Sequence, residues 1–265
     1  MNGKMENLKK SSKRILFPMI AYGGQCRGEF ALASSSLLID SLNKKDISFT
    51  VFGLFHESLI SRARNISAAY CLNDDFTHLL FIDADIAFDP KDVFKLIECE
   101  EEVVAGAYPK KYLSQNKISH IATQNPNFFK DPNWPSICTD FTTEIKEPQI
   151  RQGKRKQKLI DVDYAATGFM LISVNAFRKI IKHMPEIKYK NDIDAYMSFG
   201  DNFYDFFPAQ INKETKKFES EDYGFCRLWR RIGGSVKIMP DINLSHVGSY
   251  TFTGNLQNQI NLYNS

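Results

Sequence analysis

The chain has no apolar run approaching the ~20 residues that a membrane-spanning helix needs. It also has little excess charge, because 34 Lys and Arg residues face 31 Asp and Glu residues, which gives a formal net charge of +3. So small a balance provides no general attraction to nucleic acid or to an anionic membrane. These two absences predict a globular protein with no transmembrane segment and no nucleic-acid partner.

Cysteine is scarce and scattered. The five cysteines are odd in number, form no C-x-x-C pair, and lie at Cys26, Cys71, Cys99, Cys138 and Cys226. This pattern argues against a disulfide framework and against a cysteine metal cluster. It favours reduced thiols in the core, and we therefore expect a cytoplasmic protein.

The first hundred residues alternate between strand-like and helix-like patterns. The chain is long and apolar enough for one large domain, with 265 residues, of which 43% are hydrophobic and 13% aromatic. The periodicity predicts strands at 15–21, 47–55 and 78–82, and helices at 29–42, 58–72 and from Asp89-Pro90 onward. This alternation predicts the α/β class, with one Rossmann-like, doubly wound, mainly parallel sheet flanked by helices.

The pattern breaks between residues 110 and 158, where prolines and the basic run 151–158 predict an irregular insert. Regular elements return as a strand at 164–173, a helix at 175–184, and a helix at 220–233 that Ser220 can cap. No small-residue cleavage site follows the basic N-terminus, which we interpret as a leader and not a signal peptide. We divide the chain into a leader (1–13), one domain (14–255, with halves 14–109 and 159–255 around the insert), and a tail (256–265).

A pair of acidic residues, Asp83 and Asp85, follows the predicted strand 78–82. Residues two apart in an extended chain point the same way, and ligands bind at the carboxyl ends of strands in open α/β sheets. Two hard oxygen donors suit Mg²⁺ or Mn²⁺ with a bridging phosphate. D-x-D also occurs at 161–163 and 192–194, but not after a buried strand. The structural alternative for Asp83 and Asp85 is a strand-end turn with a helix cap.

Three further residues could take part in chemistry. Glu221 and Asp222 lie in the first turn of the predicted helix 220–233, where the helix dipole by itself favours acids. One of them could also accept a proton from a hydroxyl nucleophile. His246 could complete a metal site begun by Asp85, or it could be a structural histidine.

Two arginines, Arg62 and Arg64, begin the predicted helix 58–72 near the carboxyl edge of the sheet. Their guanidinium groups could bind a diphosphate or a ribose, or they could be ordinary surface arginines. The basic run 151–158 has no interleaved aromatic residues for base stacking, so we interpret it as a solvated loop and not a nucleic-acid site.

In their order along the chain, these motifs resemble those of GT-A-type nucleotide-sugar glycosyltransferases, in the family-2-like group that includes small viral and bacterial members. The resemblance spans about residues 14–255, apart from 110–158. The matching segments are 15–23, Arg62-Ala63-Arg64-Asn65, Phe81-Ile82-Asp83-Ala84-Asp85, Ala165-Ala166-Thr167-Gly168-Phe169-Met170, Glu219-Ser220-Glu221-Asp222-Tyr223, and His246.

The resemblance implies that the protein moves a sugar from a UDP- or GDP-sugar donor to a glycan or other hydroxyl acceptor. It implies a manganese or magnesium ion held by Asp83, Asp85 and His246, and an inverting mechanism with Asp222, or less favourably Glu221, as base. Residues 14–109 would bind the nucleotide, and 159–255 would form the acceptor and catalytic half. The implied donor-binding residues are Tyr22, Arg62, Arg64, Asn65, Asp83, Ala84, Asp85, Thr167, Gly168 and Phe169.

Other functions remain open at this point. A retaining glycosyltransferase of the same fold would not need Asp222 as base. A non-catalytic nucleotide-sugar or carbohydrate-binding module would keep Asp83 and Asp85 and make Asp222 dispensable. A haloacid-dehalogenase-type phosphatase is disfavoured, because Ala87 stands where that motif has Thr or Val and because the D-x-D follows the third predicted strand.

Overall fold

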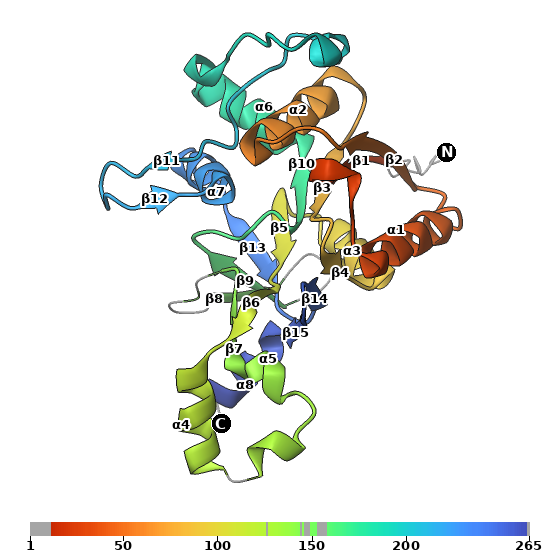
Figure 1. Ribbon diagram of the computed structural model, residues 1–265. Coiled ribbons are helices and arrows are strands. Elements are labelled where there is room, and N and C mark those ends of the chain that lie inside the picture. The colour runs from red at the N-terminus through yellow and green to blue at the C-terminus, as the bar shows by residue number, and fades with distance from the viewer. Residues whose placement is uncertain (1–11, 126, 144, 146–148, 153–157, 264–265) are drawn as a thin grey trace, which may run out of the picture.

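A central eight-stranded sheet organises the chain in a computed structural model, which describes residues 12–125, 127–143, 145, 149–152 and 158–263 (Figure 1). Its strand order is β2-β1-β3-β10-β5-β13-β9-β8. These strands are β1 (Lys13–Ile20), β2 (Ile47–Leu54), β3 (His78–Ile82), β5 (Val103–Gly106), β8 (Gln149–Gln152), β9 (Lys158–Val162), β10 (Phe169–Ser173) and β13 (Val236–Met239).

Helices and short strands surround the sheet. The helices are α1 (Gly28–Ser41), α2 (Ile60–Asn73), α3 (Pro90–Glu98), α4 (Gln115–Gln124), α5 (Trp134–Cys138), α6 (Val174–His183), α7 (Glu221–Arg231) and α8 (Leu256–Tyr263). The short strands are β4 (Ile86–Ala87), β6 (Pro109–Leu113), β7 (Thr139–Phe141), β11 (Gln210–Ile211), β12 (Phe218–Glu219), β14 (Asn243–Val247) and β15 (Thr251–Asn255). Among the described residues, no helix is both long and apolar enough to cross a membrane.

The predicted α/β class with a mainly parallel sheet is confirmed, but two strands, β10 and β9, run against the others. Strand β9 is antiparallel to both of its neighbours, β13 and β8. Strands β1, β2 and β3 are parallel to one another, and β5 is parallel to β13. Strand β10 lies between β3 and β5 and runs antiparallel to both. Periodicity predicts that a strand exists but not its direction, so the sequence alone did not indicate these reversals.

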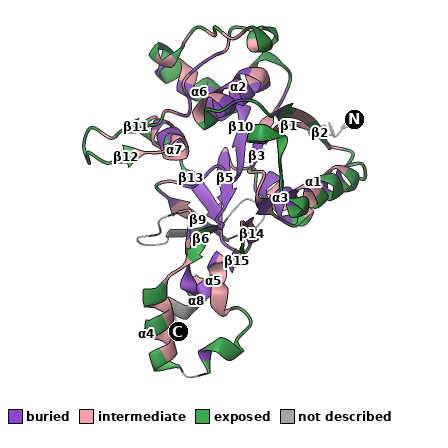
Figure 2. Ribbon diagram, viewed as in Figure 1, coloured by how far each residue is buried: buried purple, intermediate pink, exposed green. Residues whose placement is uncertain are grey.

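Strand β3 shows why the sheet is covered on both faces. Its residues alternate between two hydrophobic clusters, with Leu79 and Phe81 facing α2, α6 and α7, and Leu80 and Ile82 facing α1 and α3. Successive side chains of a strand point to opposite faces, so a continuous apolar run fits a strand buried on both sides. Figure 2 shows the central strands as buried along most of their length.

The predicted elements of the first hundred residues are confirmed to within two residues at each end. Helix α3 shows how local sequence sets a boundary. The Asp89 side chain accepts a hydrogen bond from the Lys91 backbone N–H at 2.9 Å, and Pro90 occupies the first helical position. An acidic N-cap followed by proline satisfies one free N–H group and fixes the first φ angle, so the helix begins here.

Two later expectations need correction. The strand expected at 164–173 begins only at Phe169, because residues 163–168 are turns and a single bridge between Thr143 and Ala165. The insert at 110–158 is not irregular throughout. Its described part contains α4, α5, β7, β8 and most of β6, and with α8 and β15 much of it forms a lobe that projects from the sheet (Figure 1).

Helix α7 approaches the preceding segment very closely. A Cβ built on Gly224 would lie 2.0 Å from the Pro208 carbonyl oxygen, so only glycine permits this contact. The next turn of the helix packs Phe225 against Phe207 with ring centroids 4.9 Å apart. Gly224 therefore fixes where the first turn of α7, with Glu221 and Asp222, lies relative to the sheet.

We expect Gly224→Ala to destabilise the protein by about 1–3 kcal/mol, because the added methyl group must displace backbone in a packed region. Urea unfolding measures this cost. The matched control is Gly28→Ala in α1, where nothing lies within 4 Å of the new Cβ, and its free energy of unfolding should stay the same or rise slightly. Equal stabilities for the two variants would contradict the close contact.

Candidate active site

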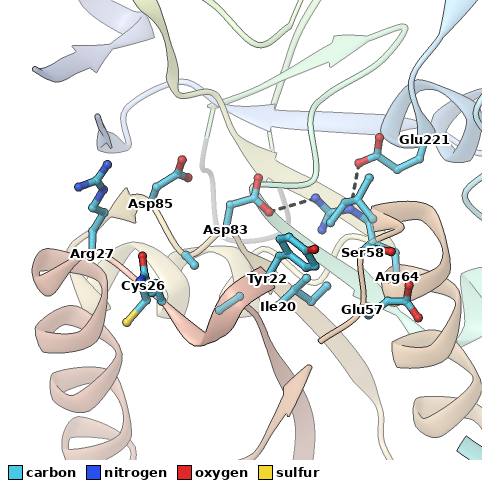
Figure 3. Close-up of a pocket in the computed structure, with 14 residues that line it drawn as sticks. Ile20, Tyr22, Cys26, Arg27, Glu57, Ser58, Arg64, Asp83, Asp85 and Glu221 are labelled. Carbon is cyan, nitrogen blue, oxygen red and sulfur yellow. Dashed lines mark hydrogen bonds and ion pairs between the residues drawn. The ribbon is translucent and has the colours of Figure 1, made fainter. Parts of the chain in front are cut away.

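A cavity of about 580 Å³ opens at the carboxyl ends of β1, β2 and β3 (Figure 3). It is lined by residues from the segments 20–27, 57–60 and 83–85, which follow these three strands, and by Arg64 and Glu221. The cavity thus lies where strand ends and helix starts converge, the usual ligand position in an open α/β sheet.

The loop after β1 forms one side of the cavity. Gly23 and Gly24 have φ angles of 76° and 70°, and the Gly23 N–H donates to the Phe55 carbonyl at 3.0 Å. Only glycine adopts such angles readily, so the pair makes a tight turn before α1. Tyr22 precedes this turn, lines the cavity and is 71% exposed, so its ring is available to stack on a ligand.

The D-x-D residues lie in a turn and not in an extended segment. The Ile86 N–H donates to the Asp83 carbonyl at 3.0 Å, which closes the turn. The Arg27 N–H donates to the Ala84 carbonyl at 2.9 Å and ties the start of α1 to the motif. Asp83, Ala84 and Asp85 all line the cavity, and Figure 3 shows both carboxylates directed to the same side.

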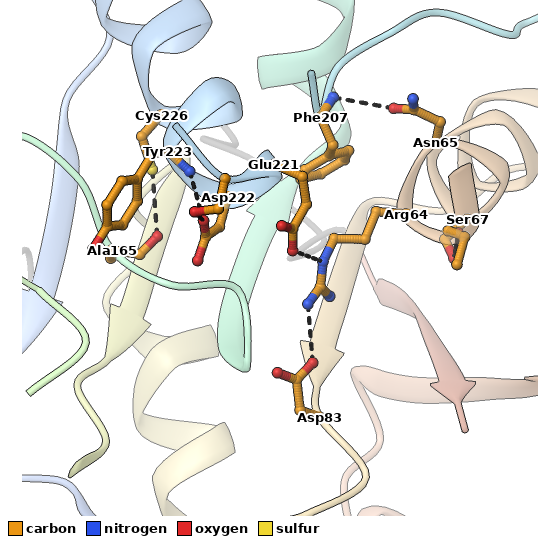
Figure 4. A network of polar contacts seen from close by, with 12 residues as sticks. Arg64, Asn65, Ser67, Asp83, Ala165, Phe207, Glu221, Asp222, Tyr223 and Cys226 are labelled. Carbon is orange, nitrogen blue, oxygen red and sulfur yellow. Dashed lines mark hydrogen bonds and ion pairs between the residues drawn. The ribbon is translucent and has the colours of Figure 1, made fainter. Parts of the chain in front are cut away.

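Arg64 is buried between two carboxylates. Its guanidinium contacts Asp83 Oδ1 at 3.0 Å and Glu221 Oε1 at 3.1 Å, and its side chain is 3% exposed (Figure 4). Burial opposes the charge of Arg64, but attraction to Asp83 and Glu221 outweighs burial and raises its pKa. These two ion pairs join the end of β3 to the start of α7. The predicted diphosphate-binding fork of Arg64 is therefore already engaged by protein carboxylates.

The structure does not bring Arg62 or Asn65 to the cavity. Arg62 pairs with Glu57 at 2.7 Å and so fixes the loop after β2. The Asn65 side chain donates to Asp205 at 3.0 Å and accepts from the Phe207 N–H at 3.1 Å. All three contacts hold parts of the protein together, and neither Arg62 nor Asn65 lines the cavity.

Asp85 lies beside His246 and Lys111. The Lys111 Nζ is 2.6 Å and the His246 Nε2 is 3.4 Å from the same oxygen, Asp85 Oδ2. Burial alone would raise the pKa of Asp85, but the imidazole and ammonium groups lower it to about 2. Asp85 is therefore ionised at neutral pH.

A backbone contact orients His246. Its Nδ1 lies 3.0 Å from the Pro109 carbonyl oxygen, which can only accept, so Nδ1 carries the hydrogen. Nε2, which faces Asp85, donates a hydrogen to that carboxylate when the ring is protonated and offers its lone pair to a metal ion when the ring is neutral. Metal-binding histidines commonly donate the other ring N–H to a backbone carbonyl in this way.

Asp85 and His246 together fit a divalent ion with two protein ligands. A carboxylate oxygen and an imidazole nitrogen face each other, and Mg²⁺ and Mn²⁺ usually take their remaining ligands from water and phosphate. In the described part of the chain, no group of three or more His, Cys, Asp or Glu residues could hold a metal ion. Asp83 directs one oxygen to Arg64, so it is less available as a ligand than Asp85.

Glu221 and Asp222 start α7 with different surroundings. Glu221 lines the cavity and pairs with Arg64, whereas Asp222 is not among the lining residues. Asp222 Oδ1 accepts from the Ser220 hydroxyl and, at 2.8 Å, from the Tyr223 N–H. Burial and then repulsion by Glu221 raise the pKa of Asp222.

The contacts of Asp222 have two consequences. The Ser220 hydroxyl bonds the Asp222 side chain and does not cap the helix backbone, which corrects the predicted role of Ser220. Both hydrogen bonds fall on Oδ1, so Oδ2 is left for another donor. Figure 4 shows Glu221 and Asp222 extending in the same direction from α7, towards the side on which Asp83 lies.

The predicted segment Thr167-Gly168-Phe169 does not line the cavity. Thr167 and Phe169 are fully buried, and the Phe169 ring packs against Phe88. Gly168 acts through its lack of a side chain, because a Cβ there would lie 2.4 Å from the Tyr108 hydroxyl and 2.7 Å from Asp83 Oδ2. It therefore permits close packing beneath the D-x-D turn.

Sequence reasoning missed Tyr108 and Lys111. Tyr108 is buried, lies edge-on to His246, and has its pKa raised by burial and then by Asp83 and Asp222, so it stays a neutral hydroxyl. The segment Tyr108-Pro109-Lys110, where the helix–strand alternation stops, was the one local signal. The other two D-x-D sequences do not line the cavity, and Asp161 is paired with Lys237.

Two solved structures show weak similarity to this chain. The mannose-1-phosphate geranyltransferase of Thermus thermophilus matches with a TM-score of 0.35 and 11% identity, over 86% of this chain and 73% of that one. A Bacillus anthracis structure described as a glucose-1-phosphate thymidylyltransferase matches with a TM-score of 0.28 and 12% identity, over 72% and 85%. No protein-family profile and no curated protein sequence matches. Similarity this weak carries no conclusion about activity.

We expect Arg64→Met to lower the free energy of unfolding by about 3 kcal/mol, because it leaves Asp83 and Glu221 without their shared cation. The control is Arg14→Met, whose pairs with Asp74 and Asp75 are longer and more exposed, and which should cost less than about 1 kcal/mol. Denaturant titration of both variants measures the difference. A loss for Arg64→Met no larger than that for the control would contradict a structural role for this ion-pair bridge.

Proposed function

We propose that this protein is a GT-A-type glycosyltransferase that moves a sugar from a nucleoside diphosphate sugar to a hydroxyl acceptor with the help of a divalent metal ion. The observation that supports this most is that Asp85 lines the cavity at the carboxyl ends of β1, β2 and β3 and lies beside the oriented His246. A carboxylate, an imidazole and a strand-end cavity are the parts needed to hold an ion and a diphosphate together.

Each side of the cavity has a role in this proposal. Tyr22 stacks on the nucleotide base, and Asp83 and Ala84 lie along the ribose. Asp85 and His246 hold Mn²⁺ or Mg²⁺, which when bound neutralises the charge that builds on the leaving diphosphate. Arg64 acts indirectly, since it keeps Asp83 and Glu221 in place.

Asp222 is the proposed base for the acceptor hydroxyl. Its raised pKa makes it a better proton acceptor than an ordinary carboxylate, and its Oδ2 accepts no hydrogen bond from the described residues. Glu221 is less suited, because its Oε1 is already engaged by the Arg64 guanidinium. A base opposite the leaving group corresponds to inversion at the anomeric carbon.

The proposal extends to the chemical class of donor and acceptor and to the cellular compartment. The donor is a UDP- or GDP-sugar, and the acceptor is a glycan or another hydroxyl compound. We propose the cytoplasm as the compartment, because all five cysteines are free thiols and four of them are buried.

We expect one or more nucleotide sugars to stabilise the protein against heat only when Mn²⁺ is present, by about 2.7 kcal/mol at 100 times Kd. Asp85→Asn should abolish this stabilisation. Asp192→Asn, in an exposed D-x-D away from the cavity, should preserve it. A panel of UDP- and GDP-sugars, followed by differential scanning fluorimetry, makes the measurement. No stabilisation of the wild-type protein by any donor would contradict the proposed function.

We expect Asp222→Asn to lower kcat by about 10²- to 10⁴-fold while donor binding stays nearly unchanged, because the base acts only on the acceptor. In the wild-type protein, kcat should rise with pH through the raised pKa of Asp222, since only the carboxylate accepts a proton. Asp163→Asn, at an exposed acid paired with Arg230, is the control. Unchanged turnover in Asp222→Asn would favour a retaining mechanism, and donor binding without any wild-type turnover would favour a binding module.

A further inference from the structure

Both carboxylates of the D-x-D turn already have cations of the protein as partners. Asp83 contacts Arg64, which is almost fully buried, whereas Asp85 contacts Lys111, whose side chain is 39% exposed. A buried guanidinium held by two carboxylates is fixed. An exposed ammonium on a flexible four-carbon chain can leave its partner at low cost.

Lys111 contacts the carboxylate oxygen that a metal ion at Asp85 and His246 would use. Its Nζ is 2.6 Å from Asp85 Oδ2, the oxygen that also faces His246 Nε2. An ammonium and a divalent ion at the same oxygen repel each other, because both are positive. A metal ion at Asp85 and His246 therefore competes with Lys111 and binds more tightly when Lys111 withdraws.

The attachment of Lys111 limits how far it moves. It lies on β6, and its Cδ is 3.5 Å from the position of a Cβ built on Gly248, so its stem rests against the turn after β14. The released ammonium therefore stays near Asp85, where the diphosphate of a bound donor would lie.

We propose that Lys111 is a displaceable internal cation, which holds Asp85 in the metal-free protein and moves to the donor diphosphate when a metal ion binds. This inference rests on the proposed function, because it concerns the same metal and donor site. It makes Lys111 a positioning residue that opposes metal binding in the absence of donor and supports it in the presence of donor. Donor and metal ion then bind cooperatively, because the donor diphosphate attracts Lys111 away from Asp85, in addition to contacting the metal ion directly.

The test is a Mn²⁺ titration of the purified full-length protein, monitored by electron paramagnetic resonance, with and without UDP and GDP. Lys111→Met should bind Mn²⁺ about 5- to 10-fold more tightly than the wild type without nucleotide, because an opposing ion pair is gone. The increase in Mn²⁺ affinity caused by the nucleotide should be smaller in Lys111→Met than in the wild type. A merely structural role for Lys111 would weaken Mn²⁺ binding instead.

Four further variants separate a displaceable cation from a structural lysine and from a misfolded variant. Lys111→Arg keeps the charge and should behave like the wild type. Lys110→Met removes an exposed neighbouring charge on the same strand and should also leave Mn²⁺ affinity unchanged. Lys111→Gln repeats the test with a polar side chain, in case methionine disturbs folding. Asp85→Asn should eliminate the site.

The outcomes distinguish this inference from the proposed function. If Lys111→Met and Lys111→Gln bind Mn²⁺ no more tightly than the wild type, the inference that the metal ion displaces Lys111 from Asp85 is overturned. The metal site and the proposed function then still stand. If the wild-type protein and all variants fail to bind Mn²⁺ with or without nucleotide, both the inference and the proposed metal site are overturned.

Discussion

The buried guanidinium of Arg64 is the contact on which the candidate site depends. It joins Asp83 at the end of β3 to Glu221 at the start of α7, two residues that are far apart in the sequence. Removing a carboxylate from water is unfavourable unless an opposite charge compensates for it. Without Arg64, the D-x-D turn and the first turn of α7 would repel each other. The acidic residues can share one region because this cation lies between two of them.

The four acidic residues of the site, Asp83, Asp85, Glu221 and Asp222, differ in which positive side chain lies next to them. Asp83 and Glu221 share the fixed cation Arg64, so both have a structural role. Asp85 has an exposed and replaceable cation, Lys111, so it is the acid that can exchange its partner for an external ion. Asp222 has no cation partner among the described residues, and its raised pKa follows from burial and from repulsion by Glu221. The proposed metal ligand, Asp85, and the proposed base, Asp222, thus differ in whether a positive side chain lies next to the carboxylate.

The sequence contained the local features of this arrangement but not its long-range contacts. Apolar periodicity predicted β3 and its neighbours, and the position of Asp83 and Asp85 at a strand end followed from the same pattern. The partners of Arg64 could not be predicted, because they lie 19 and 157 residues away and no periodicity relates such positions. Lys111 was missed because it lies in a segment without a clear pattern. The direction of β10 was missed because an apolar run fits either direction.

The sheet topology gives a reason for the site that is independent of the acidic motif. Strand β1 lies between β2 and β3. The chain therefore passes from β1 to β2 on one side, and then crosses over to β3 on the other side. Helix α1 packs in the cluster on one face of the sheet, and α2 packs mainly in clusters on the other. Parallel strands whose connections diverge in this way leave a crevice at their carboxyl ends. The cavity lies at this crevice, so topology and side-chain chemistry indicate the same place for a ligand.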